Sequence, residues 1–188
     1  MADRPSLVGS VAWAGATTLA ERLVRTVSPS RSMGLLATYV PLGIAAAARG
    51  RAPSEGRPGS ASEAVVGLSL AFGGYQVGRW LLDDVPDQEP PDAFVPELVT
   101  LGVVVPLAEE AIWASRVEPR FGVVATAAAF ATKHPIVDRR WRRTLGLALF
   151  WTGLGLIRRR TRRGAALAHV VANSGAAVLG HLTRRDRF

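Results

Sequence analysis

The chain contains several apolar segments that are long enough, as helices, to cross a lipid bilayer, and no other feature restricts the fold as strongly. A bilayer core of about 30 Å requires about 20 helical residues. Charges are rare within these segments and frequent between them, as is typical of membrane helices joined by loops. The segments that we expect to be helical are 33–48, 61–82, 93–115, 121–133, 144–157 and 164–182.

The first apolar stretch, 6–24, permits two interpretations. It is either a further span or an amphipathic helix at the membrane surface, because it carries Trp13 together with Glu21 and Arg22. The sequence therefore predicts an all-α fold, a polytopic membrane helix bundle with six or seven transmembrane helices.

Two stretches, 49–60 and 83–92, are too rich in proline, glycine and charge for a helix interior, so we expect linkers outside the bilayer. The first linker divides the chain into N-terminal membrane segments, residues 1–60, and a core unit, residues 61–188. The candidate functional residues described below fall within this core unit.

Composition supports a membrane protein and argues against a nucleic-acid binder. The 188 residues are 48% hydrophobic and carry a net charge of +8. The arginines form short runs beside apolar segments, such as 139–143 and 158–163, rather than following one face of a long polar helix. We therefore expect membrane lipids, and no nucleic acid, as partners. The chain has no cysteine, which excludes disulfides and thiolate metal sites.

Ionisable and strongly polar side chains inside apolar segments are costly in a membrane and often mark a functional cavity. Here they are Glu97, Glu109, Glu110, His134, His169 and Asn173, with Arg79 and Glu63 nearer the segment ends. These residues are the first candidates for a site.

Glu109 and Glu110 follow Pro106, which we expect to open the helix just before them. Adjacent carboxylates point about 100° apart on a helix, so one can face a cavity while the other braces it. Two carboxylates in an apolar site also favour one that stays ionised and acts as a base. The alternative is a pair that marks a helix end near the membrane surface.

His169 and Asn173 are four residues apart and share one helical face, and Phe130 and His134 have the same relation. Taken singly, His169 and Asn173 are also typical of side chains that join packed helices by hydrogen bonds. Taken singly, His134 before a proline is typical of a residue at the membrane surface.

In chain order, EE at 109–110, FxxxH from Phe130 to His134 and HxxxN from His169 to Asn173 resemble the three motifs of the CPBP family. This family comprises the CAAX-protease and bacteriocin-processing membrane endopeptidases, often called Abi proteins. The resemblance covers roughly residues 106–180. It implies an integral membrane hydrolase, an intramembrane metalloprotease in the plasma membrane of a prokaryote, acting on membrane-associated or prenylated peptides.

By this resemblance, Glu109 activates the attacking water and Glu110 supports it. His134 and His169 polarise that water or bind a metal, and Asn173 stabilises the oxyanion. Peptide hydrolysis needs such a base and such donors, and both are stronger where bulk water is excluded. Glu109, His134 and His169 could hold zinc with one open position, and water activation without a metal is the alternative.

The sequence departs from the family pattern at its arginine. The family motif is EExxxR followed by glycine, and Ala114 and Ser115 occupy those two positions here. Arg116 lies about 200° around the helix from the arginine position. The motif arginine is therefore missing.

The spacing of the motifs also departs from the family. Only 24 residues separate Glu110 from His134, so a turn near Glu118 and Pro119 would leave two straight antiparallel helices offset by a full turn or more. Lys133, beside His134, is unusual for a catalytic pocket, although neighbours on a helix point in different directions.

These departures leave two rival hypotheses. One is a non-catalytic CPBP-like membrane scaffold or immunity protein, which the missing arginine favours. The other is a small transporter whose buried glutamates relay protons. The presence together of both glutamates, both histidines and Asn173 favours the protease.

Overall fold

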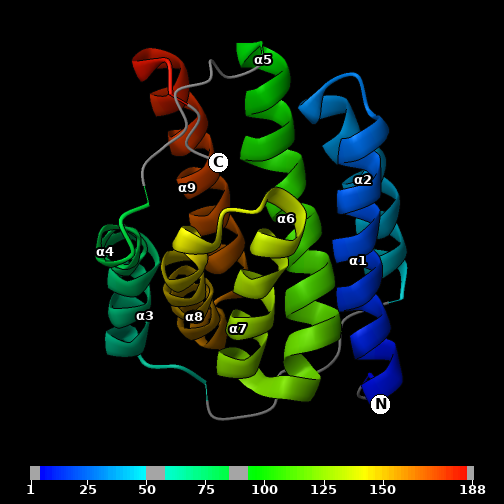
Figure 1. Ribbon diagram of the computed structural model, residues 1–188. Coiled ribbons are helices and arrows are strands. Elements are labelled where there is room, and N and C mark those ends of the chain that lie inside the picture. The colour runs from blue at the N-terminus through cyan, green and yellow to red at the C-terminus, as the bar shows by residue number, and fades with distance from the viewer. Residues whose placement is uncertain (1–4, 50–57, 85–92, 186–188) are drawn as a thin grey trace.

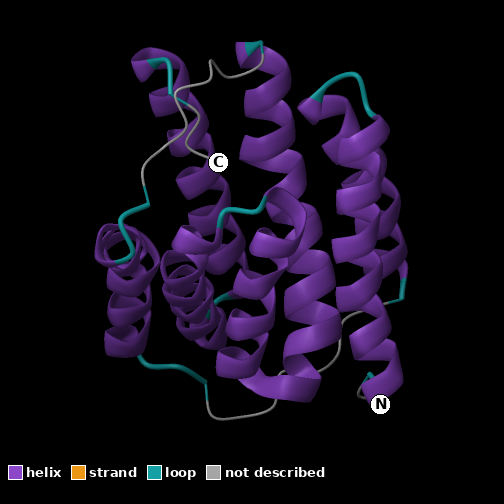
Figure 2. Cartoon of the chain, viewed as in Figure 1, coloured by secondary structure: helices purple, strands orange, loops and turns teal. Residues whose placement is uncertain are grey.

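The computed structural model describes residues 5–49, 58–84 and 93–185, and all regular secondary structure in these ranges is helical (Figures 1 and 2). The all-α prediction is confirmed. Most of each predicted linker lies outside the described residues. The elements are α1 (Leu7–Val27), α2 (Arg31–Ala48), α3 (Ala61–Leu68), η1 (Ser69–Gly74), α4 (Tyr75–Leu81), α5 (Phe94–Glu97), η2 (Leu98–Val104), α6 (Val105–Glu109), η3 (Glu110–Val117), α7 (Glu118–Asp138), η4 (Trp141–Arg143), α8 (Thr144–Arg160) and α9 (Arg162–Thr183).

Four helices begin at side chains that cap their first backbone N–H groups. Ser6, Ser30 and Thr161 each accept a hydrogen bond from the backbone three residues on, at the starts of α1, α2 and α9. At α3, Ser60 and Glu63 form a reciprocal capping box. Each cap stabilises its helix by about 1 kcal/mol. Glu63 therefore has a local structural role.

The predicted segments 93–115 and 121–133 belong to one helical stretch, Phe94–Asp138, that reverses direction once. The backbone leaves the helical conformation at Gly122, whose φ of 77° lies in the left-handed region that favours glycine. Figure 1 shows the two arms side by side and joined at their lower end. The reversal thus comes later than the turn predicted near Glu118 and Pro119.

Pro106 does not open the helix as the sequence predicts. It lies in the first turn of α6, and the chain is helical on both sides of it. The residues before α6 form the π-helical segment η2, and Glu110 begins a second one, η3. Widened turns of this kind are frequent at functional sites. Glu109 lies between the π-helical segments η2 and η3.

Helices α3 and α4 pack on α8 through glycines. A Cβ added to Gly67 would lie 2.7 Å from the carbonyl oxygen of Gly153, and one added to Gly78 would lie 2.6 Å from the backbone nitrogen of Gly146. No larger residue fits at those distances, so the missing side chains are what lets the backbones approach. Small residues at helix contacts are typical of membrane bundles.

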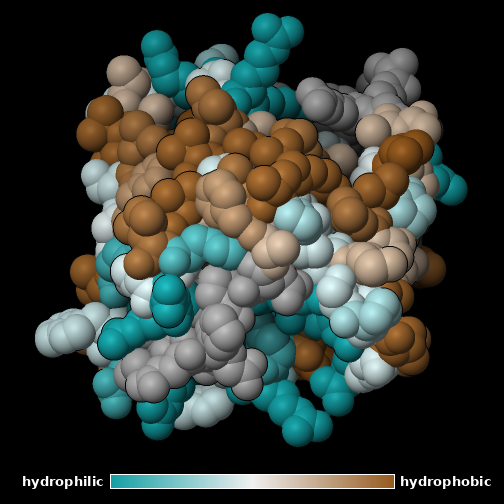
Figure 3. Space-filling model, turned by 90° about the horizontal axis from the view of Figure 1, so that it is seen from above, coloured by the Kyte–Doolittle hydropathy of each residue, from teal (hydrophilic) through white to brown (hydrophobic). Residues whose placement is uncertain are grey.

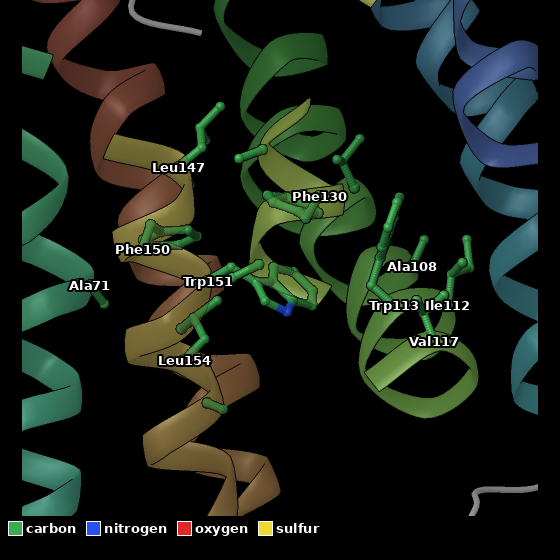
Figure 4. Packing of buried hydrophobic residues seen from close by; sticks show 14 of the residues in the cluster. Ala71, Ala108, Ile112, Trp113, Val117, Phe130, Leu147, Phe150, Trp151 and Leu154 are labelled. Carbon is green, nitrogen blue, oxygen red and sulfur yellow. The ribbon is translucent and has the colours of Figure 1, made fainter. Parts of the chain in front are cut away.

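The hydrophobic core lies largely between η3, α7 and α8 (Figure 4). Phe130 stacks on Trp151 with ring centroids 4.2 Å apart, and Trp113 meets Phe130 edge-on at 5.6 Å. Such pairs contribute about 0.5–1.5 kcal/mol each beyond the area they bury. The rings also contact both histidines, since His134 lies 5.3 Å from Phe130 and His169 lies 5.9 Å from Trp151. The core therefore supports the two histidines directly.

Two helical stretches of the described chain are long and apolar enough to cross a membrane, Phe94–Asp138 and Arg162–Thr183. The first is the stretch that reverses at Gly122. Length and composition thus support the membrane prediction in its coarse form. The number of six or seven spans stays a prediction.

Candidate active site

A cavity of about 400 Å³ lies between the helices and brings the three sequence motifs together. Glu109 reaches it from α6, His134 from α7, and His169 and Asn173 from α9. Glu110 is not among the described residues that line it. The rest of its wall is mainly apolar and includes Leu35, Leu101, Val105, Leu147 and Phe150.

Glu109 is the last residue of α6 and is 3% exposed. Its Oε1 accepts hydrogen bonds from Lys133 Nζ at 2.6 Å and from the Tyr39 hydroxyl at 3.0 Å. Its Oε2 lies 3.6 Å from His169 Nε2. A buried carboxylate is costly unless it is paired, and Lys133 supplies the opposite charge. Oε2 is the oxygen that faces the histidine.

Lys133 joins Glu109 to a second buried carboxylate, Glu21 of α1. Lys133 Nζ lies 3.2 Å from Glu21 Oε2 and 2.6 Å from the Tyr39 hydroxyl. The hydroxyl also lies 2.6 Å from Glu21 Oε2, and Arg25 binds the other Glu21 oxygen at 2.9 Å. This network of Glu21, Arg25, Tyr39, Glu109 and Lys133 ties α1, α2, α6 and α7 together. We call it the buried ion network.

Lys133, rather than His134, reaches the first glutamate of the motif. Gly122 lies roughly midway between Glu109 and Lys133 in the sequence, so the two arms of the reversal are level at these residues. One residue further along α7, the side chain of His134 is rotated by about 100°. The position of the reversal therefore determines that Lys133, and not His134, contacts Glu109.

His134 lines the cavity and pairs with Asp138 rather than with Glu109 or Glu110. Its Nδ1 lies 3.6 Å from Asp138 Oδ2, one helical turn away. Arg143 Nη1 lies 3.5 Å from the same carboxylate oxygen. Among the described residues, the buried Nε2 of His134 has no hydrogen-bond partner. This nitrogen is a free donor or acceptor at the cavity wall.

Glu110 points away from the cavity toward α8. Arg158 Nη1 binds both of its oxygens, at 2.8 Å to Oε1 and 2.6 Å to Oε2, and Arg158 Nη2 binds Glu118 Oε2 at 2.8 Å. Glu110 Oε1 also lies 3.4 Å from His169 Nδ1. His169, which is 1% exposed, thus stands between the two glutamates. The contact of Glu110 with His169 is its link to the cavity.

Asn173 lies one helical turn after His169 on α9. Its Nδ2 donates to the carbonyl oxygen of Leu101 at 3.1 Å. The hydroxyl of Ser174 donates to the carbonyl oxygen of Gly102 at 3.2 Å. Both acceptors lie in the π-helical segment η2. Because an amide nitrogen has two hydrogens, one remains for the cavity.

Two further sequence candidates have structural partners. Glu97 is 1% exposed, and its Oε2 lies 2.8 Å from His181 Nε2. Arg79 also lines the cavity, and its Nε donates to Asp84 Oδ2 at 2.5 Å. These pairs connect α5 to α9 and fix the end of α4.

The zinc ligands expected from the sequence are Glu109, His134 and His169. Within the described ranges, no group of three such side chains is placed to hold a metal ion. Glu109 and His169 are neighbours, but the Lys133 ammonium binds the first and His134 turns toward Asp138. As arranged, this donor set does not fit zinc. Zinc binding stays a prediction, and elemental analysis of the purified protein would test it.

Sequence reasoning missed several residues that complete the site. Glu21, Tyr39 and Arg158 lie outside every motif, and their partners are far away in the sequence. For Glu21 the available signal was a carboxylate in an apolar stretch, and for Tyr39 a hydroxyl within an apolar helix.

No protein-family model, curated protein or solved structure matches the chain.

Proposed function

We propose that the protein is a CPBP-like membrane endopeptidase of the CAAX-protease type, which cleaves membrane-associated or lipid-modified peptides with glutamate-activated water. The observation that carries the proposal is the meeting of Glu109, His134, His169 and Asn173 at one cavity. They come from three separate helices, and polar groups gathered in an apolar bundle are typical of a functional site.

The outer surface supports a position in a membrane, with six or seven helices spanning it. Large apolar side chains are exposed on most of the described helices, and lipid would cover them in a bundle that spans the membrane. Figure 3, which looks onto the upper ends of the helices, shows a continuous hydrophobic area there as well. Large exposed apolar side chains include Val8, Leu23, Val27, Ile44, Val65, Val66, Trp80, Val124, Leu167 and Leu182.

In the proposed reaction, a water molecule lies on the cavity side of Glu109 Oε2 and His169 Nε2, which are 3.6 Å apart, and contacts both. A carboxylate only accepts hydrogen bonds, so the contact to Glu110 favours a proton on His169 Nδ1 and leaves a lone pair on Nε2. Glu109 takes a proton from the water, and the resulting hydroxide attacks the peptide carbonyl carbon. The proton then passes to the amine as the C–N bond breaks.

Donors for the developing oxyanion line the same cavity. The second amide hydrogen of Asn173 is available for an oxyanion, because Leu101 accepts only the first. The Lys133 ammonium adds a positive charge beside Glu109. Both act in a site where bulk water is largely excluded, which strengthens such interactions.

The cavity also has an apolar route to the outside. Phe72 of η1 and Val171 of α9 line it, and they are 39% and 53% exposed. Residues that both line the cavity and are exposed support an opening between these two elements. An apolar group attached to a peptide could enter there from the lipid, which supports prenylated or similar substrates.

The test is cleavage by protein reconstituted in lipid vesicles. Prenylated and unmodified peptide libraries are incubated with it, and the products are read by mass spectrometry. Glu109→Gln keeps the shape and removes the base, so cleavage should be lost while the helical circular dichroism is retained. Asn173→Ala should slow cleavage about 100- to 1000-fold, as the loss of one oxyanion donor does. Equal cleavage by the wild type and by Glu109→Gln would remove this glutamate from the mechanism.

A non-catalytic CPBP-like scaffold or immunity protein is the second candidate. The observation that favours it is that Lys133 and Tyr39 already bind Oε1 of Glu109, the residue that would have to serve as the base. If the folded wild type cleaves no membrane-associated peptide of either library, this second function replaces the first.

A further inference from the structure

We infer that Arg158 is a positioning residue of the site, which holds Glu110 so that Glu110 orients His169. It supplies from α8 the cation that the motif lacks at Ala114. Arg158 lies 48 residues after Glu110 and outside every motif. The inference rests on the proposed function, because the step that it assists is water activation by Glu109 and His169.

The Arg158 guanidinium is held between two carboxylates at the end of α8. Its Nη1 binds both oxygens of Glu110, at 2.8 and 2.6 Å. Its Nη2 and Nε bind the two oxygens of Glu118, at 2.8 and 3.3 Å. The arginine side chain is 7% exposed, so water screens these pairs little. A planar guanidinium fork fixes geometry as well as charge.

The orientation of Glu110 passes to the reacting groups through one imidazole. Glu110 Oε1 lies 3.4 Å from His169 Nδ1, and His169 Nε2 lies 3.6 Å from Glu109 Oε2. The partner of one ring nitrogen decides which nitrogen carries the proton. Arg158 therefore acts on the proposed water position indirectly, through the side chains of Glu110 and His169.

The aromatic core keeps this arrangement rigid. The Arg158 guanidinium lies over the Trp151 ring, 4.9 Å from its centroid, and Trp151 meets His169 edge-on at 5.9 Å. Phe150 contacts the same imidazole at 5.1 Å. The imidazole is thus packed by rings on α8 and turned by the carboxylate that Arg158 holds.

The kinetic test compares Arg158→Gln, Glu110→Gln and the double variant, each normalised to folded protein. Arg158→Gln should lower kcat about 10- to 100-fold with little change in KM, as the loss of an outer partner of a site histidine does. The double variant should be no slower than Glu110→Gln alone, since Arg158 acts through Glu110. Arg158→Lys should recover part of the rate. The control is Arg159→Gln, the same change at the exposed neighbouring residue.

Several results would overturn the inference. One is a folded Arg158→Gln variant with unchanged kcat. Another is a double variant in which the two losses multiply, because a merely structural arginine would act independently of Glu110. If Arg158→Gln does not fold, the comparison uses Arg158→Lys, which keeps the charge and loses the fork.

A second measurement needs no substrate. The chain has three histidines, so His134→Gln with His181→Gln leaves His169 as the only imidazole in a ¹⁵N-histidine NMR spectrum. In this background His169 should carry its proton on Nδ1, and adding Arg158→Gln should raise the fraction protonated on Nε2. An unchanged spectrum would refute the role of Arg158. A changed spectrum without any peptidase activity would refute the proposed function and leave the role of Arg158 intact.

Discussion

At the scale of single residues, Lys133 has the largest consequence for stability. It is 2% exposed and its ammonium lies within 3.2 Å of an oxygen of each buried carboxylate, Glu21 and Glu109. The ammonium also lies over the Phe130 ring, with Nζ 5.1 Å from the ring centroid. The ammonium therefore compensates charge at a place that water hardly reaches.

Lys133→Met keeps the stem and removes the ammonium, which leaves two buried carboxylates without their shared cation. We expect a loss of about 3–5 kcal/mol in the free energy of unfolding, as for other broken buried pairs. Chemical denaturation in detergent, followed by circular dichroism, measures it. Arg120→Met is the control, because it removes an exposed cation from the same helix. Equal stability of the two variants would contradict the pairing.

The residues of the candidate site could be predicted from the sequence only in part. Polar groups in apolar segments correctly pointed to the residues that line the cavity, Glu109, His134, His169 and Asn173. Their exact partners could not be predicted, because a shift of one residue turns a helical side chain by about 100°. For this reason Lys133 meets Glu109 where His134 was the candidate.

At the scale of elements, the contact of α3 and η1 with α8 depends on the absence of side chains. A Cβ on Gly153 would lie 2.5 Å from the backbone nitrogen of Ala71 and 3.0 Å from its Cα. Gly153→Val should therefore force the helices apart and cost about 1–3 kcal/mol or more. Gly73→Val is the matched control on η1, because this glycine faces away from the contact and a Cβ there meets nothing within 4 Å. Thermal unfolding midpoints of both variants in detergent test this, and equal midpoints would refute it.

Helices as elements were predictable because apolar length, caps and linkers are local signals. The segments expected at 33–48, 144–157 and 164–182 correspond to α2, α8 and α9. The exact position of the reversal, at Gly122 rather than near Glu118 and Pro119, and the π-helical segments were not predictable, since they depend on which arm packs against which. Helix propensity depends on single residues and does not indicate which helices pack together.

At the scale of the whole molecule, the exposed apolar surface predicts firm association with lipid. The protein should stay in the membrane fraction after washing with 1 M salt or with alkaline carbonate, and detergent should release it, since apolar burial is insensitive to charge screening. Immunoblotting of the fractions measures this. Release by salt alone would show an electrostatic attachment to the membrane surface and contradict a bundle that spans it.

The buried ion network spans the first linker of the chain. Helices α1 and α2 carry Glu21 and Tyr39, and the helices after the linker carry Glu109 and Lys133. Each portion keeps one ion pair of its own, Glu21 with Arg25 and Glu109 with Lys133. The contacts of Lys133 with Glu21 and Tyr39, and of Tyr39 with Glu109, form only when the two portions meet. We therefore expect the two portions to complement each other. A backbone cut between residues 49 and 58 would yield fragments that are stable together and unstable apart, and their reassembly would report on the site without any substrate.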